Sequence, residues 1–193
     1  MNKNKNPWQT LKSETKYDNP WIKVVENKVI NPNGGDGIYG VVHFKNIAVA
    51  IIPLDEEGNT YLIGQYRYTL NSFEWEIPMG GSSKKDIPLD SAKRELREET
   101  GISAKIWTNI LETQVSNSVS DEVSVTYLAQ DLLYEQAMPE ETEELFIKKL
   151  HISAAIQMVL NGEIRDSISI ASLLKLNYLI ENNLISHSKS NKA

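Results

Sequence analysis

In the first part of the chain, hydrophobic and polar residues alternate over segments that have the length of β-strands. Residues 21–31 alternate well enough for one strand, and residues 38–45 fit a second. Between them, residues 31–37 concentrate Gly, Asn, Asp and Pro, the residues that favour turns. We therefore expect a β-hairpin inside an N-terminal β unit over residues 1–45. Residues 1–16 are polar, and we expect them to be frayed or loosely ordered.

More strands are expected over the next thirty or so positions. Residues 46–53 form a continuous apolar run, the pattern of a strand covered on both faces. Residues 55–59 are rich in turn formers, so residues 60–68 are expected to return as the partner strand of a second hairpin. Residues 73–78 then fit a short strand that ends at a proline and two glycines.

The clearest helical pattern covers residues 88–100. Pro88 suits the first helical position, Asp90 suits the first turn, and Gly101 suits a left-handed residue after the last turn. Two strands and two helices are expected after it, at residues 102–115, 122–130, 153–162 and 166–183. This order favours an α/β (α+β) fold, namely an α/β/α sandwich with a mixed sheet that is preceded by an N-terminal antiparallel β unit.

Composition narrows the class of protein. The chain has 193 residues and no cysteine, which excludes disulfides, thiolate metal sites and a cysteine nucleophile. No run of about 18 apolar residues occurs, and no apolar stretch follows the basic N-terminus as in a secretory signal. The net charge of −6 argues against broad nucleic-acid binding. We therefore expect a cytoplasmic protein without nucleic-acid or membrane partners.

Three glutamates of the predicted helix, Glu95, Glu98 and Glu99, fall within one narrow stripe on a helical wheel. Ala92 and Leu96 belong to the apolar stripe directly beside them, so the carboxylates are expected at the edge of the buried face. Carboxylates this close repel one another, and a hard divalent cation such as Mg²⁺ relieves that repulsion. The alternative interpretation of the three glutamates alone is a solvated acidic face.

The spacing around these glutamates adds a second observation. Gly80 precedes Asp86 by six residues, and Arg94 follows Asp86 by eight. Together with the glutamates, Gly101 and Ile102, this pattern resembles the Nudix box, in which Asp86 stands where the family has Glu. The resemblance implies mainly structural roles for Asp86, Arg94 and Gly101. In the family, the arginine pairs with box carboxylates and holds the loop onto the helix, so Asp86 is expected to be its partner from the loop.

The resemblance to the Nudix box also implies a metal site. By it, the ligands are the backbone carbonyl of Met79 and the carboxylates of Glu95 and Glu99, while Glu98 ligates or assists. The expected ion is Mg²⁺, for which Mn²⁺ can substitute. The resemblance further implies a Nudix hydrolase domain over residues 46–185, followed by a disordered tail at 186–193.

The likeness extends beyond the box. The segments QYRY at 65–68, WEIP at 75–78, SDE at 120–122 and NGEIRD at 161–166 resemble the ADP-ribose and nucleoside-diphosphate-sugar pyrophosphatases. Those enzymes are homodimers whose N-terminal β unit contributes to the interface and often to the partner's site. The resemblance therefore implies a homodimer in which residues 1–45 serve dimerisation and substrate binding.

Five residues are candidates for substrate binding. Arg67 can contact phosphate, because a guanidinium matches phosphate oxygens in bidentate fashion, and its alternative is a surface arginine at a strand end. Trp75 can stack on a base, although a tryptophan in a strand is more often part of the core. Glu76 is a candidate acceptor for a sugar hydroxyl. Gly80 and Gly81 let the backbone approach a metal and its ligand.

The acidic segment at residues 140–144 is the candidate source of a general base. In the subfamily a glutamate of this loop activates the attacking water, and Glu143 is the best match, followed by Glu141 and Glu144. Glu98 is a further candidate for catalysis. The alternative interpretation of the segment is a solvated acidic turn.

These features predict metal-dependent hydrolysis of the diphosphate linkage of ADP-ribose or another nucleoside-diphosphate sugar to a nucleoside monophosphate and a sugar phosphate. Residues 113–119 lack the proline that is usual in ADP-ribose-specific members, so ADP-ribose is not favoured over other nucleotide sugars. Two alternatives remain: a non-catalytic Nudix module that senses nucleotide sugars, and a pyrophosphohydrolase of nucleoside triphosphates or RNA ends.

Overall fold

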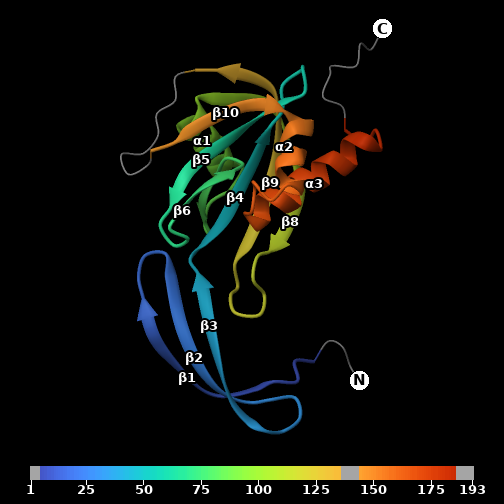
Figure 1. The fold of residues 1–193 in the computed structure, drawn as a ribbon. Coiled ribbons are helices and arrows are strands. Elements are labelled where there is room, and N and C mark those ends of the chain that lie inside the picture. Colours follow the sequence, from blue (N-terminus) through green and yellow to red (C-terminus); the bar gives the residue numbers. More distant parts are fainter. Residues whose placement is uncertain (1–4, 136–143, 186–193) are drawn as a thin grey trace. The chain divides into compact units, whose positions relative to one another are not determined.

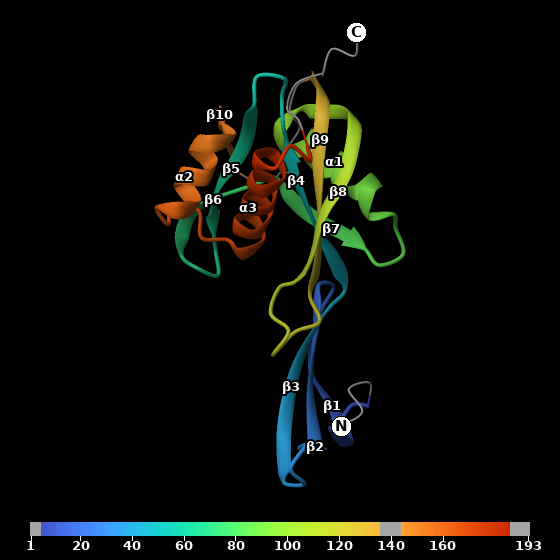
Figure 2. The ribbon, with the colours of Figure 1, turned by 90° about the vertical axis from the view of Figure 1, so that its right-hand side faces the viewer.

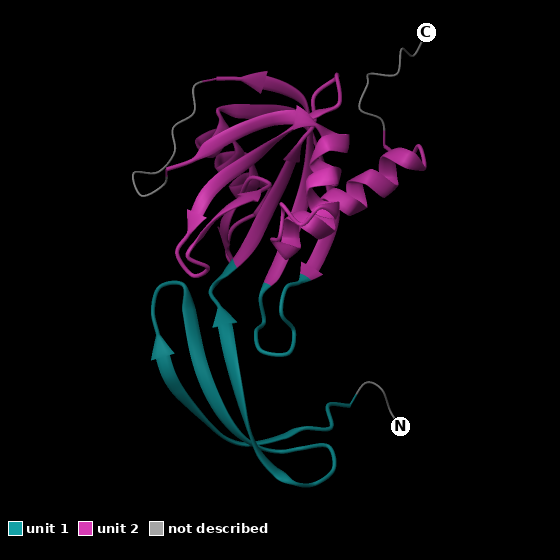
Figure 3. Cartoon of the chain, in the orientation of Figure 1, with its two compact units in different colours: residues 1–46, 114–122 teal, residues 47–113, 123–193 magenta. Residues whose placement is uncertain are grey.

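The chain folds into two compact units in a computed structural model that describes residues 5–135 and 144–185. Unit 1 consists of residues 1–46 and 114–122, and unit 2 consists of residues 47–113 and 123–193 (Figure 3). Unit 1 is therefore discontinuous in sequence, because its second segment lies far along the chain. The tail expected to be disordered, 186–193, lies outside the described residues.

Unit 1 contains one three-stranded antiparallel sheet in the order β1-β2-β3. Its strands are β1 (Gln9–Asp18), β2 (Ile22–Ile30) and β3 (Asp36–Phe44). The predicted hairpin of β2 and β3 is confirmed. Its turn is held by the Asn31 carboxamide oxygen, which accepts hydrogen bonds from the backbone N–H groups of Asn33 and Gly35 at 2.9 and 3.1 Å.

The expectation that residues 1–16 are frayed is wrong from Gln9 onwards, because β1 begins there and pairs with β2. All ten residues of β1 are exposed, so no side of the strand carries the apolar alternation from which a strand is recognised. Its Thr10, Thr15 and Tyr17 do favour strands, and pairing with β2 provides the backbone hydrogen bonds.

Unit 2 contains a four-stranded sheet in the order β7-β4-β9-β8. Its strands are β4 (Asn46–Pro53), β7 (Met79–Ser83), β8 (Ile102–Gln114) and β9 (Val123–Tyr134). Strands β4 and β9 run parallel, with Ala48 opposite Ser124. The apolar run predicted to be covered on both faces is β4, in which Val49 to Ile52 are all fully buried.

A second sheet of unit 2 has the order β10-β5-β6, and its pairs are antiparallel. Its strands are β5 (Asn59–Arg67), β6 (Ser72–Glu76) and β10 (Phe146–His151). The expected second hairpin is therefore wrong, because β4 and β5 belong to different sheets and only an isolated bridge, Leu54 with Thr60, connects them. Strand β10 was not predicted, because it is short and takes its place through pairing with β5.

The three predicted helices are confirmed as α1 (Pro88–Thr100), α2 (Ile152–Leu160) and α3 (Ser167–Glu181). Helix α1 lies on one side of the four-stranded sheet and α3 lies on the other, as Figure 2 shows. The predicted α/β/α sandwich is therefore present, with a parallel β4–β9 pair (Figure 1). Within the described ranges, no helix has both the length and the apolar character needed to cross a membrane.

Both interfaces of the sandwich are well packed. On one side, Ala92 and Leu96 of α1 are fully buried in a cluster with Val49 and Ile51 of β4. On the other side, Thr126 of β9 shares a buried hydrogen bond of 2.8 Å with Ser172 of α3. Burial of α1 against β4 fixes which edge of the helix stays accessible, and this edge carries the glutamates.

Candidate metal and diphosphate site

Helix α1 begins and ends at the predicted residues. Pro88 is its first residue, and Gly101 after it has φ 68° and ψ 17°, a left-handed conformation that glycine adopts without strain. The Gly101 N–H donates to the carbonyl of Arg97 at 2.9 Å. These two ends set the register of the helix, and with it the positions of its glutamates.

The three glutamates of α1 lie at the boundary between core and surface, as the helical wheel predicts. The side chains of Glu95 and Glu98 are 15% and 28% exposed, and Glu99 is 4% exposed. The interpretation as a fully solvated acidic face therefore fails for Glu99. A buried carboxylate beside two partly buried ones is an arrangement that favours a bound cation.

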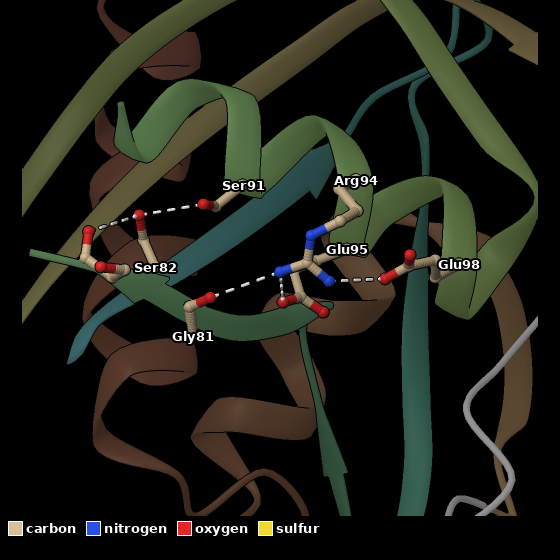
Figure 4. A network of polar contacts seen from close by, with 7 residues as sticks. Gly81, Ser82, Ser91, Arg94, Glu95 and Glu98 are labelled. Carbon is tan, nitrogen blue, oxygen red and sulfur yellow. Dashed lines mark hydrogen bonds and ion pairs between the residues drawn. The ribbon is translucent and has the colours of Figure 1, made fainter. Parts of the chain in front are cut away.

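Arg94 braces this edge of the helix. Its guanidinium donates to Glu98 Oε2 at 2.7 Å, to Glu95 Oε1 at 2.6 Å and to the carbonyl of Gly81 in β7 at 3.4 Å (Figure 4). Partial burial lowers the pKa of Arg94, but the charges of Glu95 and Glu98 and the hydrogen bonds to them outweigh it and raise that pKa. These contacts join Arg94 to two box carboxylates and to β7, as the Nudix resemblance implies.

The expected ion pair between Asp86 and Arg94 is absent from the described residues. Asp86 is exposed, and its backbone N–H donates to the carbonyl of Ser83 in a turn at the end of β7. Its carboxylate is one methylene shorter than that of Glu, and Glu95 and Glu98 already occupy the guanidinium. The substitution of Asp for Glu in the box therefore leaves the brace formed by Arg94 in place.

Strand β7 approaches α1 closely enough to shape the site. A Cβ at Gly80 would overlap the carboxylate of Glu95, so a side chain here would force that carboxylate to shift. Next along the strand, the Ser91 hydroxyl donates to the Ser82 hydroxyl oxygen at 2.9 Å (Figure 4). The glycine at position 80 therefore forms a cradle for a carboxylate that is predicted to hold metal.

Arg67 and Glu76, two predicted substrate residues, contact each other. Glu76 is buried, and its carboxylate accepts from Arg67 Nε at 2.9 Å, with a further short contact to Nη2. This hydrogen bond raises the pKa of Arg67, and the charges of Asp166 and Glu99 raise it further. Arg67 therefore lies within electrostatic reach of the carboxylate edge of α1.

Trp75 lies on the other face of the second sheet. Successive residues of a strand point to opposite faces, so Trp75 points away from the face of Glu76. Its ring meets Phe73 edge-on with centroids 5.3 Å apart, and Lys148 Nζ lies 4.2 Å from its centroid. The two residues predicted to bind substrate, Trp75 and Glu76, therefore lie on different surfaces of β6.

Sequence reasoning missed the pair of Glu74 and Arg165. Glu74 is buried on the same face of β6 as Glu76, and it accepts from Arg165 Nε at 3.2 Å and from Ser72 at 2.5 Å. The hydrogen bond from Arg165, followed by that from Ser72, lowers the pKa of Glu74. The sequence does contain a sign of this pair. Glu74 and Glu76 stand at alternate positions of one strand, so their side chains share a face.

Asp166, the next residue, closes the N-terminus of α3 by accepting from the Ser169 N–H at 2.7 Å. Two of the three glutamates proposed as the base, Glu141 and Glu143, lie outside the described residues. Glu144 is described, and it is exposed shortly before β10.

Comparison with known proteins bears on this arrangement of helix, glutamates and arginine. Residues 44–165 match the family model described as the NUDIX domain. The chain belongs to the Nudix family. Residues 8–42 match a second model, described as the nucleoside diphosphate sugar hydrolase N-terminal domain.

Two relatives cover most of this Nudix chain. An ADP-ribose pyrophosphatase of Mycobacterium tuberculosis is 36% identical over 172 residues, which span 86% of this chain and 82% of the relative. An ADP-ribose pyrophosphatase of Bacillus subtilis is 29% identical over 161 residues, which span 82% and 86%. A solved structure, the crystal structure of ADP compounds hydrolase, superposes with a TM-score of 0.82 over 91% of this chain and 95% of that one. Because the two sequences are only 20% identical, this similarity shows that the chains share a fold and nothing more.

Nudix hydrolases generally need a divalent metal ion. We therefore compare the residues at the edge of α1 with the ligands that such an ion requires. In the part of the chain that the structure describes, no three His, Cys, Asp or Glu side chains are gathered to hold an ion. Glu95 and Glu98 instead share Arg94. Their chemistry fits a hard cation nevertheless, because carboxylate and carbonyl oxygens are the ligands it prefers, and the Gly80 cradle leaves room for Glu95 beside β7.

Proposed function

We propose that this Nudix chain hydrolyses the diphosphate linkage of ADP-ribose or another nucleoside-diphosphate sugar to a nucleoside monophosphate and a sugar phosphate. The observation that carries the proposal is the edge of α1 that bears the partly buried Glu95 and Glu98 and the buried Glu99, with the Glu95 carboxylate against Gly80 of β7. The substrate class is supported by the two relatives named ADP-ribose pyrophosphatase and by the match of residues 8–42.

Under this proposal the carboxylates of Glu95, Glu98 and Glu99 and the carbonyl of Met79 hold the metal. The ion is Mg²⁺, for which Mn²⁺ can substitute, and it would neutralise the diphosphate and polarise the attacked phosphorus. Arg94 holds Glu95 and Glu98 in place through its hydrogen bonds, and a bound cation would share the charge of these carboxylates with it. An acidic protein can therefore accept an acidic substrate.

Arg67 is the candidate for direct contact with the diphosphate. Its hydrogen bonds to Glu76 fix the plane of the guanidinium, and its remaining N–H groups can reach phosphate oxygens. Glu76 is then a positioning residue and a candidate acceptor for a sugar hydroxyl. Gly80 and Gly81 let the backbone of β7 come close to the bound group.

The chemical step consumes one water. Its oxygen bonds to one phosphorus, the bond from that phosphorus to the bridging oxygen breaks, and the water proton passes to a base. We assign the base to the loop glutamates, with Glu143 first and Glu141 and Glu144 as alternatives. Glu98, the most exposed glutamate of the α1 edge, is the candidate to assist.

We also propose that residues 46–185 form the Nudix domain and that residues 1–45 pair two copies into a homodimer in the cytoplasm. Large apolar side chains on the surface of unit 1 support the pairing, among them Trp8, Tyr17 and Trp21. Sedimentation equilibrium tests it, and a monomer at micromolar concentration would remove this part of the proposal.

The activity is tested by incubating the chain with Mg²⁺ or Mn²⁺ and a panel of ADP-ribose, other nucleotide sugars, dinucleotides and nucleoside triphosphates. We expect cleavage of at least one nucleotide sugar to a monophosphate and a sugar phosphate. Cleavage confined to triphosphates would favour a triphosphate or RNA-end pyrophosphohydrolase. Binding of nucleotide sugars without any cleavage would favour a sensing module.

Glu99→Gln tests the metal assignment. The change keeps the size of the buried side chain but removes its charge, so turnover should fall by on the order of 1,000-fold or more while the fold persists. Glu112→Gln, an exposed change on β8, is the matched control. Steady-state rates and melting temperatures of both variants make the comparison, and unchanged turnover in Glu99→Gln would contradict the assignment.

Glu141→Gln, Glu143→Gln and Glu144→Gln, compared under the same conditions, locate the base. The true base should lose about 100-fold or more in kcat, since general base catalysis contributes that much, and the other two variants should stay near the wild-type rate. Equal rates in all three variants would remove the loop from the mechanism.

A further inference from the structure

A cavity of about 300 Å³ opens on unit 2 between α1 and the start of β8. It is lined by Lys93, Arg94, Arg97, Ser103, Ala104 and Trp107. None of the three glutamates of the α1 edge lines it. Arg94 is the one lining residue that the proposed reaction uses, and the other five have no role in it.

Three basic residues line this cavity, although the chain as a whole has a net charge of −6. Arg94 already bonds Glu95 and Glu98, but the other two cations are available. Lys93 lies 3.7 Å from Asp90 in an exposed pair, which contributes little. Arg97 forms no ion pair with any residue in the described ranges. Two cations without a firm partner, one helical turn apart, favour an anion.

Trp107 gives the cavity an aromatic wall. Its indole Nε1 donates to the carbonyl of Ala104 at 2.9 Å, and its ring meets Tyr127 edge-on with centroids 6.4 Å apart. These contacts hold the half-buried ring in one orientation beside the cations. A fixed aromatic ring next to basic side chains is the combination that binds a planar base and its phosphate.

We propose that this cavity binds a nucleoside monophosphate at a site separate from the carboxylate edge of α1. Lys93 and Arg97 hold the phosphate, Trp107 packs against the base, and the Ser103 hydroxyl offers a hydrogen bond. The volume stands at the lower end of small-molecule sites, which fits a mononucleotide better than a larger dinucleotide. The site binds its ligand whether or not the chain has the proposed hydrolytic activity.

The test is calorimetric titration of adenosine 5′-monophosphate into the full chain with EDTA present, so that no divalent metal contributes. Lys93→Ala and Arg97→Ala should each weaken binding roughly tenfold or more, because each loses a charged hydrogen-bonding partner of the phosphate. Lys105→Ala is the matched control, since this lysine lies on β8 and pairs with Asp131 outside the cavity. Both cavity side chains are exposed, so neither change endangers the fold.

A second comparison tests the base. Ribose 5-phosphate should bind about fivefold or more weakly than adenosine 5′-monophosphate, and Trp107→Leu should remove that difference, with circular dichroism confirming the fold. Equal binding of the two ligands by the wild type would overturn the role of Trp107.

Binding that survives both Lys93→Ala and Arg97→Ala would overturn the site itself, and so would the absence of any binding at millimolar concentration. Binding that is lost in Arg67→Ala but kept in Arg97→Ala would place the nucleotide at the proposed diphosphate site, and it too would overturn the inference. Activity on nucleotide sugars is measured separately, so failure of one proposal leaves the other standing.

Discussion

At Gly80 a single hydrogen atom in place of a methyl group lets the carboxylate of Glu95 lie directly against the backbone of β7. The spacing of the box predicts a glycine here, and the structure gives the physical reason. Pro88 and Gly101 were likewise predictable, because each suits one backbone conformation at one end of a helix. The pairing of Arg94 with carboxylates of the box was also expected, but its loop partner Asp86 was wrongly expected, since spacing in the sequence does not show how far the loop carboxylate lies from the guanidinium.

Gly80→Ala should therefore damage the site more than the fold. The added Cβ displaces Glu95 or β7, and a misplacement of about 1 Å in a catalytic group costs on the order of 100-fold in rate. Rates on a nucleotide sugar and the affinity for Mn²⁺, followed by electron paramagnetic resonance, measure the effect.

Gly40→Ala on β3 is the control, because a Cβ there meets no heavy atom within 4 Å. A Gly80→Ala variant with wild-type metal affinity would show that Glu95 is free to move without consequence.

At the scale of the elements, the strands and helices with the strongest local patterns were predicted correctly, but the pairing of the strands within the sheets was not. The apolar run of β4 predicts burial on both faces, yet its neighbours, β7 and β9, come from distant parts of the sequence. Local alternation suggested β5 as its partner, because β5 is the next strand along the chain. Strands β1 and β10 were missed since one is wholly exposed and the other short. Pairing between distant segments decided the places of β4, β5 and β10, whereas β1 pairs with β2, its neighbour along the chain.

The link between β6 and the segment before α3 should depend on pH. The hydrogen bond from Arg165 lowers the pKa of Glu74 in the folded state. A group of this kind stabilises the fold fully above its unfolded pKa of about 4.3, and the stabilisation is lost as the pH falls through the lower folded value. Arg165→Met should therefore be less stable than the wild type at pH 7, and the difference should shrink below about pH 4.

Urea unfolding at several pH values between neutral and acid measures this difference. Arg97→Met is the matched control, because Arg97 has no ion pair in the described residues, so its effect on stability should not change over the same range. A difference for Arg165→Met that stays constant as the pH falls would exclude Glu74 as the titrating group.

At the scale of the whole molecule, the two units do not coincide with two stretches of sequence. The family models divide the chain between residues 42 and 44, whereas unit 1 also includes residues 114–122. This second segment is tied to β3, since Asp121 accepts from the Phe44 N–H and from His43 Nδ1, both at 2.8 Å. Turn-forming residues at 116–118 predict a loop. The local sequence does not show which distant strand this loop contacts.

Asp121→Ala should weaken unit 1 alone. The Phe44 N–H loses its acceptor, so its hydrogen-exchange protection should fall roughly tenfold, as expected for a lost bond to a charged group. Amides of α3 in unit 2 should keep their protection. Exchange followed by NMR makes the comparison, and an equal loss of protection in both units would show that they open as one.

The discontinuity of unit 1 has a consequence for the order of events during synthesis. Strands β1, β2 and β3 leave the ribosome first and can pair with one another at once. The carbonyl of Val119, which accepts from Val42, and the carboxylate of Asp121 are translated only after β4 to β8. A nascent chain that stops before residue 114 therefore carries the sheet of β1 to β3 without the hydrogen bonds that residues 119–121 supply to it, and unit 1 is completed only after β4 to β8 have been translated.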